Sequence, residues 1–196
     1  VIDRDGACGY GECTAPEEPF FNHETIDTAW LIIGKFVAPI LAGNPVEEAS
    51  QVSSTLAPIR GNRMAIAGVE TAIWDLEARL RNLPLWRHLG GTQEQINCGV
   101  SIGLQDSPEV LLEKVTHEVE SGYQRIKLKI KPGQDIELVR MIRSNFPDIK
   151  LSVDANSAYR LDRDTRLFQQ LDEFGLLMIE QPLTAGDLVD HAKLQT

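Results

Sequence analysis

The sequence predicts an α/β fold in which a helix-rich α+β region precedes a series of parallel βα units. Two observations predict it. The chain changes character near Gly90 and Gly91, and after that point runs of strand length alternate with stretches of helix length. Strands and helices that alternate in this way build a parallel sheet covered by helices. We therefore expect two domains, residues 1–90 and 91–196.

The first region contains an extended start, a loop and several helices. We expect Gly9–Glu12 to be extended and Ala15–Asn22, rich in proline, glutamate and phenylalanine, to be a loop. The clearest helix is Met64–Leu83, where apolar residues recur every three or four positions until Pro84 breaks the pattern. This pattern indicates a small, mainly helical α+β domain.

Four βα units follow. The predicted strands are Ile96–Ile102, Arg125–Ile130, Leu151–Asp154 and Leu176–Glu180. The predicted helices are Pro108–Glu120, Asp135–Ser144, Asp164–Phe174 and a last helix that begins within Asp187–Leu194. Strands that alternate with helices of this length favour a parallel sheet.

Composition narrows the function classes. Asp and Glu outnumber Lys and Arg by 29 to 19, which argues against nucleic acid or an anionic membrane as a partner. Apolar stretches end before the roughly 20 residues of a membrane span, and no secretion signal is evident. The three cysteines show no metal or redox spacing, which is typical of reduced thiols in the cytoplasm. We expect a cytoplasmic protein.

Charged side chains mark three of the predicted strands. Lys127 and Lys129 share one face of their strand, and Asp154 and Glu180 end the next two. The steps are 28 residues from Ser101 to Lys129, then 25 to Asp154 and 26 to Glu180, so one polar group per unit is expected at one level. In α/β barrels the carboxyl ends of strands converge on the catalytic site.

Each position also has a structural explanation. The alternating lysines are typical of the wet face of a half-exposed strand. Asp154 alone is a reasonable helix N-cap, and Glu180 alone a structural ion-pair partner. The joint occurrence at matched strand ends favours function. Converging carboxylates suit Mg²⁺, a nearby lysine suits a general base, and a metal bound to a substrate carboxylate stabilises an enediolate.

At these residues the sequence resembles the muconate-lactonising subgroup of the enolase superfamily, and within it the o-succinylbenzoate synthase and N-acylamino acid racemase family. The matching stretches are 125–130 (RIKLKI), 152–159 (SVDANSAY), 177–183 (LMIEQPL), 61–76 and 15–22. This resemblance implies an N-terminal capping domain over residues 1–90. It also implies the first four βα units of a TIM-type (β/α) barrel over residues 91–196.

The resemblance also implies roles for individual residues. Lys129 would be the acid/base, with Lys127 as its electrostatic companion. Asp154 and Glu180 would be two of three ligands for Mg²⁺, or for Mn²⁺ in its place. Asn156 would support the metal shell.

Three further residues would bind substrate, although each has an equally good structural role. Ser101 either faces the substrate or has only a packing role in the fold. Phe20 and Phe21 belong either to a capping loop that sets specificity or to a hydrophobic anchor of that loop.

By the same resemblance, the third ligand is expected near residue 205 and the opposing lysine one unit later. We therefore expect a truncated chain that is inactive by itself. Exposed strand edges favour association, so a homo-oligomer fits.

The implied reaction is metal-dependent removal of the proton α to a carboxylate of a small molecule. We favour o-succinylbenzoate synthase, a carbon–oxygen lyase of menaquinone biosynthesis. N-acylamino acid (N-succinylamino acid) racemase is the alternative, because both reactions begin with the same step. Dipeptide epimerase, muconate cycloisomerase and a non-catalytic, decayed barrel are further alternatives.

Overall fold

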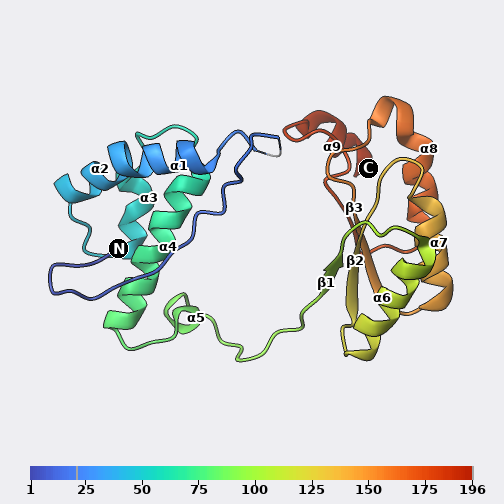
Figure 1. Cartoon of the computed structure of the whole chain (residues 1–196), viewed down its shortest axis with the longest axis horizontal. Coiled ribbons are helices and arrows are strands. Elements are labelled where there is room, and N and C mark those ends of the chain that lie inside the picture. Colours follow the sequence, from blue (N-terminus) through green and yellow to red (C-terminus); the bar gives the residue numbers. More distant parts are fainter. Residues whose placement is uncertain (21, 196) are drawn as a thin grey trace. The chain divides into compact units, whose positions relative to one another are not determined.

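The computed structural model describes residues 1–20 and 22–195, so Phe21 and Thr196 lie outside the described residues. The chain divides into two compact units, Val1–Glu94 and Gln95–Thr196 (Figure 1), and each has its own hydrophobic core. The predicted α/β architecture is confirmed, because a helix-rich unit precedes a unit of alternating strands and helices.

The first unit is built around one long helix. Its elements are α1 (Ile26–Ile32), η1 (Ile33–Val37), α2 (Ala38–Gly43), η2 (Ala49–Gln51), α3 (Val52–Thr55), α4 (Arg63–Leu80) and α5 (Leu85–His88). A core of Val37, Val52, Leu56 and Ile66 joins the shorter helices to α4. The predicted helix therefore exists and ends before Pro84, as expected.

The extended segment before the helices lies directly against α4. A Cβ atom added to Gly9 would come within 2.1 Å of the Ala72 carbonyl oxygen, and one added to Gly11 within 2.1 Å of the Gly68 carbonyl oxygen. Any side chain at these two positions would push the segment off the helix. The Gly-Tyr-Gly sequence is thus explained by close backbone packing.

A buried carboxylate secures the start of α4. Glu24 is 2% exposed, and its side chain accepts hydrogen bonds from the backbone N–H groups of Met64 and Ala65 at 3.0 and 3.1 Å. These N–H groups have no partner within the helix, and the helix dipole favours a negative charge there. Glu24 therefore ties the loop that carries Phe20 to the central helix of the unit.

The helices α1, η1 and α2 form one continuous run of 18 residues, Ile26–Gly43. Its mean hydropathy of 1.5 makes it long and apolar enough to cross a membrane, judged by length and composition alone. The sequence prediction of interrupted apolar stretches missed this run. One side of it nevertheless packs on the core around α4, through Ile32, Val37 and Ile40. Packing of one apolar side is typical of a surface helix in a globular domain.

The second unit is a four-stranded parallel sheet in the order β1-β2-β3-β4. Its strands are β1 (Val100–Ile102), β2 (Arg125–Lys129), β3 (Lys150–Asp154) and β4 (Met178–Glu180). Its helices are α6 (Pro108–Glu120), α7 (Ile136–Asn145), α8 (Leu161–Asp172) and α9 (Leu188–Leu194). Each strand pairs with the strand of the preceding unit, as in a barrel that closes in sequence order.

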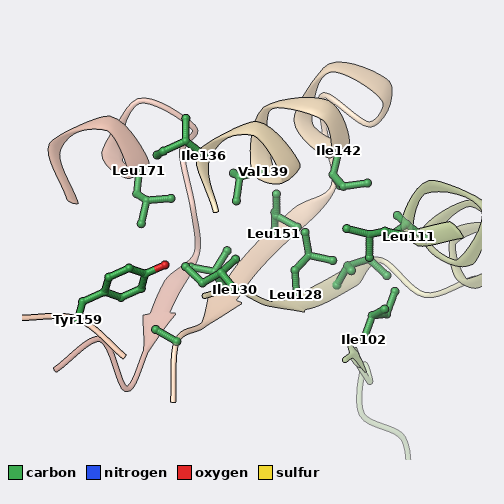
Figure 2. Close-up of a cluster of buried hydrophobic side chains, with 14 of the residues drawn as sticks. Ile102, Leu111, Leu128, Ile130, Ile136, Val139, Ile142, Leu151, Tyr159 and Leu171 are labelled. Atoms are coloured by element: carbon green, nitrogen blue, oxygen red, sulfur yellow. The ribbon is translucent and has the colours of Figure 1, made fainter. Parts of the chain in front are cut away.

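One face of this sheet forms the main core of the unit. Leu128 and Leu151 point from the strands toward α7, where they meet Val139 and Ile142 (Figure 2). Ile126 belongs to the same cluster of buried side chains. All five side chains are almost completely buried. Because side chains alternate across a strand, the other face receives Lys127 and Lys129.

A single arginine fastens the edge of the sheet where the strands begin. The Arg143 guanidinium on α7 donates to the carbonyl oxygens of Pro147 and Ile149 at 2.9 and 2.8 Å, just before β3. It also donates to the Phe174 and Gly175 carbonyl oxygens at 2.9 and 3.3 Å, just before β4. Arg143 thus satisfies carbonyl groups of two loops that accept no other hydrogen bond from residues 1–20 and 22–195.

Candidate active site

The alternation of β2 separates its lysines from the core. Ile126 and Leu128 are 0% and 1% exposed, whereas Lys127 and Lys129 are half-buried on the opposite face. The sequence interpretation of this strand therefore agrees with the structure. Two ammonium groups on a sheet face need nearby negative charge or water, because burying a charge without a partner is costly.

The carboxyl ends of three strands are level. In the register of the sheet, Lys129 lies opposite Asp154, and Asp154 lies opposite Glu180. Neighbouring strands are about 4.8 Å apart, so the three residues occupy a strip roughly 10 Å wide. A lysine and two carboxylates thus come together although Lys129 and Glu180 are 51 positions apart in the chain.

Ser101 lies lower than these three residues. It is opposite Lys127, two residues before the level of Lys129, and its side chain is exposed. The sequence prediction placed it one level too high, because the register pairs Ser101 with Lys127, 26 residues on, and not with Lys129, 28 residues on. Ser101 shares a concavity of about 460 Å³ with Lys127 and Glu180.

The two lysines have different surroundings. Lys127 Nζ lies 2.6 Å from Glu180 Oε2, in an ion pair whose side chains are 27% and 34% exposed. Within residues 1–20 and 22–195, Lys129 Nζ makes no hydrogen bond or ion pair, and its side chain lines a second concavity of about 280 Å³ beside the loops after β1 and β2. Lys127 is therefore engaged by Glu180, whereas Lys129 has no such partner among the described residues.

The Asp154 carboxylate is oriented by the residue two positions on. Asp154 Oδ1 accepts hydrogen bonds from the backbone N–H and the side-chain Nδ2 of Asn156, both at 3.0 Å. The other oxygen, Oδ2, receives no hydrogen bond from any described residue. Asn156 Nδ2 also donates to Gln181 Oε1 at 3.0 Å, so the loops after β3 and β4 are joined.

A tyrosine joins the loops after β2 and β3 in the same way. Tyr159 is 2% exposed, and its hydroxyl donates to Asp135 Oδ2 at 3.0 Å. Burial and the adjacent Asp135 carboxylate hold the pKa of Tyr159 far above its usual value. Sequence reasoning missed both Tyr159 and Gln181, because neither residue type carries a charge that draws attention in a sequence.

Phe20 and Phe21 are the two residues of the first unit that were predicted to contact substrate. Phe20 is 87% exposed, in a loop that Glu24 ties to α4, and Phe21 lies outside the described residues. The structure does not test their predicted contact with substrate.

The donor set is suited to a hard divalent cation. Asp154 Oδ2 and Glu180 Oε1 each remain without a hydrogen bond from the described residues, on adjacent strands at one level. Carboxylate oxygens are the ligands that Mg²⁺ prefers. The described residues hold no group of three or more His, Cys, Asp or Glu side chains that could bind a metal, so these two carboxylates alone would form a partial site.

Fold and site together define a class. The chain combines a helix-rich unit with parallel βα units whose strands carry two lysines and two carboxylates toward their ends. Residues 1–90 match the profile of the mandelate racemase / muconate lactonizing enzyme N-terminal domain, and residues 111–196 match the enolase C-terminal domain-like profile. The chain belongs to the enolase superfamily.

Individual relatives agree with this class. The chain is 48% identical to an o-succinylbenzoate synthase of Geobacillus kaustophilus, over 100% of the chain and 52% of that protein. It is 43% identical to an N-succinylamino acid racemase of Thermus thermophilus, over 97% of the chain and 52% of that protein. A solved enolase superfamily member from Listeria innocua, 43% identical, superimposes with a TM-score of 0.95 over 99% of the chain and 52% of its own. The chain thus spans about half the length of the relatives it matches.

Proposed function

We propose that this chain carries part of the active site of an o-succinylbenzoate synthase, which removes the proton α to a carboxylate and then eliminates water. The observation that carries the proposal is the level arrangement of Lys129, Asp154 and Glu180 at the carboxyl ends of three adjacent strands. Similarity to o-succinylbenzoate synthases, at 48% identity for the relative from Geobacillus kaustophilus, supports the choice of reaction.

In this reaction Lys129 acts as base and then as acid. Neutral Nζ takes the α-proton, and the electron pair of the broken C–H bond moves into the carboxylate to give an enediolate. The enediolate then expels the β-hydroxyl group, which takes the proton from Lys129 and leaves as water. One lysine on one face of the substrate is enough for both transfers, which fits the single unpaired lysine of β2.

We propose Mg²⁺ as the cofactor, with Mn²⁺ as a substitute. Asp154 and Glu180 would hold it, with Asn156 supporting Asp154. When bound, the ion would supply positive charge at the oxygen atoms on which negative charge develops. Lys127, which pairs with Glu180, would be the electrostatic companion of Lys129.

The remaining assignments extend the same proposal. Residues 1–90 would cap the site, with Phe20 and Phe21 in the loop that sets specificity, and residues 91–196 would form the first four units of the barrel. Ser101 would face the substrate from the floor of the site. The enzyme would work in the cytoplasm on a small carboxylate, where the free cysteines Cys8, Cys13 and Cys98 would stay reduced.

N-succinylamino acid racemisation is the second candidate, supported by the relative from Thermus thermophilus. It begins with the same proton transfer but needs a base on each face of the substrate. The two reactions therefore differ in what a second base does, and an assay with both substrates separates them.

The test is a hybrid enzyme. This chain replaces the aligned residues of the o-succinylbenzoate synthase from Geobacillus kaustophilus, and o-succinylbenzoate formation is followed with and without Mg²⁺. We expect metal-dependent turnover that falls by at least about 10³-fold in Lys129→Ala, because the general base is lost. Lys131→Ala, an exposed lysine two residues on, is the control and should keep full activity.

Three outcomes would change the proposal. Turnover that survives Lys129→Ala would refute the role of this lysine. A folded hybrid that racemises N-succinylamino acids but forms no o-succinylbenzoate would move the assignment to the second candidate. A folded hybrid with neither activity would favour a decayed site.

A further inference from the structure

Gln181 has a backbone conformation that its residue type rarely adopts. Its φ angle is +44°, in the left-handed region, which among non-glycine residues is populated mainly by asparagine and aspartate. Asn156, at φ +42°, has the same conformation in the loop after the neighbouring strand. Local strain of this kind persists only where surrounding contacts hold it, and it concentrates at functional sites.

The contacts that hold both residues connect the two carboxylate-bearing strands. Ser157 N–H donates to the Gln181 carbonyl oxygen at 2.7 Å, and Ala155 N–H donates to the Glu180 carbonyl oxygen at 3.0 Å. These backbone bonds fix the loop after β4 against the loop after β3. The Gln181 side chain is thereby brought to Asn156, where Oε1 accepts a hydrogen bond from Nδ2 at 3.0 Å.

This bond decides how the Asn156 amide is used. Nδ2 has two protons, and the described residues provide one acceptor for each, Asp154 Oδ1 and Gln181 Oε1. With both acceptors in place the amide plane cannot rotate without losing a hydrogen bond. Asp154 Oδ1 is then held by the amide and by the Asn156 backbone N–H, so Oδ2 is the oxygen left to face a cation.

We propose that Gln181 is a positioning residue of the metal site, which acts through Asn156 to make Asp154 present a single oxygen, Oδ2. The inference rests on the proposed function and adds to it a residue that touches neither metal nor substrate. Glutamine provides the acceptor without charge, whereas a leucine or methionine side chain would leave one amide proton of Asn156 without a partner. Partners of this kind typically change metal affinity by about 10- to 100-fold.

The test measures Mn²⁺ affinity of the hybrid enzyme described above, which supplies the third ligand expected beyond residue 196, by electron paramagnetic resonance of the free ion, so that it does not depend on turnover. We expect Gln181→Met to weaken Mn²⁺ binding by about 10-fold or more. Gln181→Glu keeps the acceptor and should bind at least as tightly as the wild type. Gln169→Met, an exposed glutamine on α8, is the matched control and should show no change. Far-UV circular dichroism verifies that each variant is folded.

A double-mutant cycle tests the route through Asn156. If Gln181 acts through this residue, Gln181→Met should cost little further affinity once Asn156→Ala is present. Equal affinity of Gln181→Met and wild type, or losses that simply add, would overturn the inference while leaving the proposed function intact. If the unsubstituted hybrid binds no Mn²⁺, the metal site on which the inference rests is wrong, and the inference is wrong with it.

Discussion

The ion pair between Lys127 and Glu180 predicts how the site responds to loss of one charge. Lys127→Met removes the ammonium group but keeps most of the length of the side chain. Glu180 then loses its partner at 2.6 Å, and its carboxylate has only solvent to balance its repulsion from Asp154 on the adjacent strand. We expect a less stable chain that binds a divalent cation more tightly.

The size of both effects follows from exposure. The two side chains are 27% and 34% exposed, so solvent screens much of their attraction. Partly exposed pairs contribute up to about 1 kcal/mol. Unfolding of the cation-free variant should therefore require about 1 kcal/mol less free energy. In the wild type, a cation that binds Glu180 must first displace Lys127 and so loses the energy of this ion pair. In Lys127→Met that cost is absent, and 1 kcal/mol corresponds to about fivefold tighter binding of the cation.

The assay combines urea unfolding with Mn²⁺ titration of the wild type, Lys127→Met and Lys150→Met. Lys150 is an exposed lysine at the beginning of β3, so its replacement removes the same charge far from the carboxylates. We expect tighter Mn²⁺ binding in Lys127→Met alone. Equal affinities for the two variants would show that Glu180 is not withheld from the cation by Lys127, and the reasoning would then be wrong.

Three other predictions concern stability. Arg143→Met should lower the free energy of unfolding by about 3 kcal/mol, because several carbonyl groups lose a charged donor. The control, Arg140→Met on the same helix, removes an exposed ion pair and should lower it by less than about 1 kcal/mol. Equal losses for the two variants in urea unfolding would contradict this prediction. Glu24→Gln should destabilise the first unit by about 1–2 kcal/mol, because the start of α4 loses its buried negative charge. The loss should appear as a lower melting temperature. The same change at an exposed glutamate of this loop should leave the melting temperature unchanged. Because the pKa of Tyr159 is raised in the folded chain, its hydroxyl ionises above about pH 10 only in the unfolded chain, so the free energy of unfolding falls as pH rises. Tyr159→Phe should flatten this fall between about pH 9 and 11. If the slope of the free energy of unfolding against pH is the same in the variant, Tyr159 is not its source.

The sequence was most informative where one pattern determined both structure and chemistry. The alternation around Lys127 and Lys129 correctly predicted a strand with one buried and one polar face, because period two in a strand leaves no other arrangement. The helix Met64–Leu83 was also predicted, since its apolar period is long and Pro84 limits it. The level of Asp154 and Glu180 followed from nearly equal spacing of the units.

Element ends were predicted less well, because pairing decides them and pairing is not local. The strand expected from Ile96 begins at Val100, and Ile96 is exposed. The helix expected from Asp164 begins earlier, at Leu161, and Asp164 itself has a non-helical φ of −110° inside it. In the site, Gln181 escaped prediction because its role depends on a left-handed backbone and a contact with another loop, neither of which is visible in a sequence.

The position of Arg143 has a consequence for how this fold can change. It binds the loops that precede the strands, whereas the lysines and carboxylates stand at the opposite edge, where the strands finish. Residues at the carboxyl ends of the strands can therefore be replaced without breaking the Arg143 hydrogen bonds at the beginnings of β3 and β4. The contacts that keep this unit folded and the side chains proposed to do its chemistry therefore lie at different edges of the sheet, so substitutions in one group need not disturb the other.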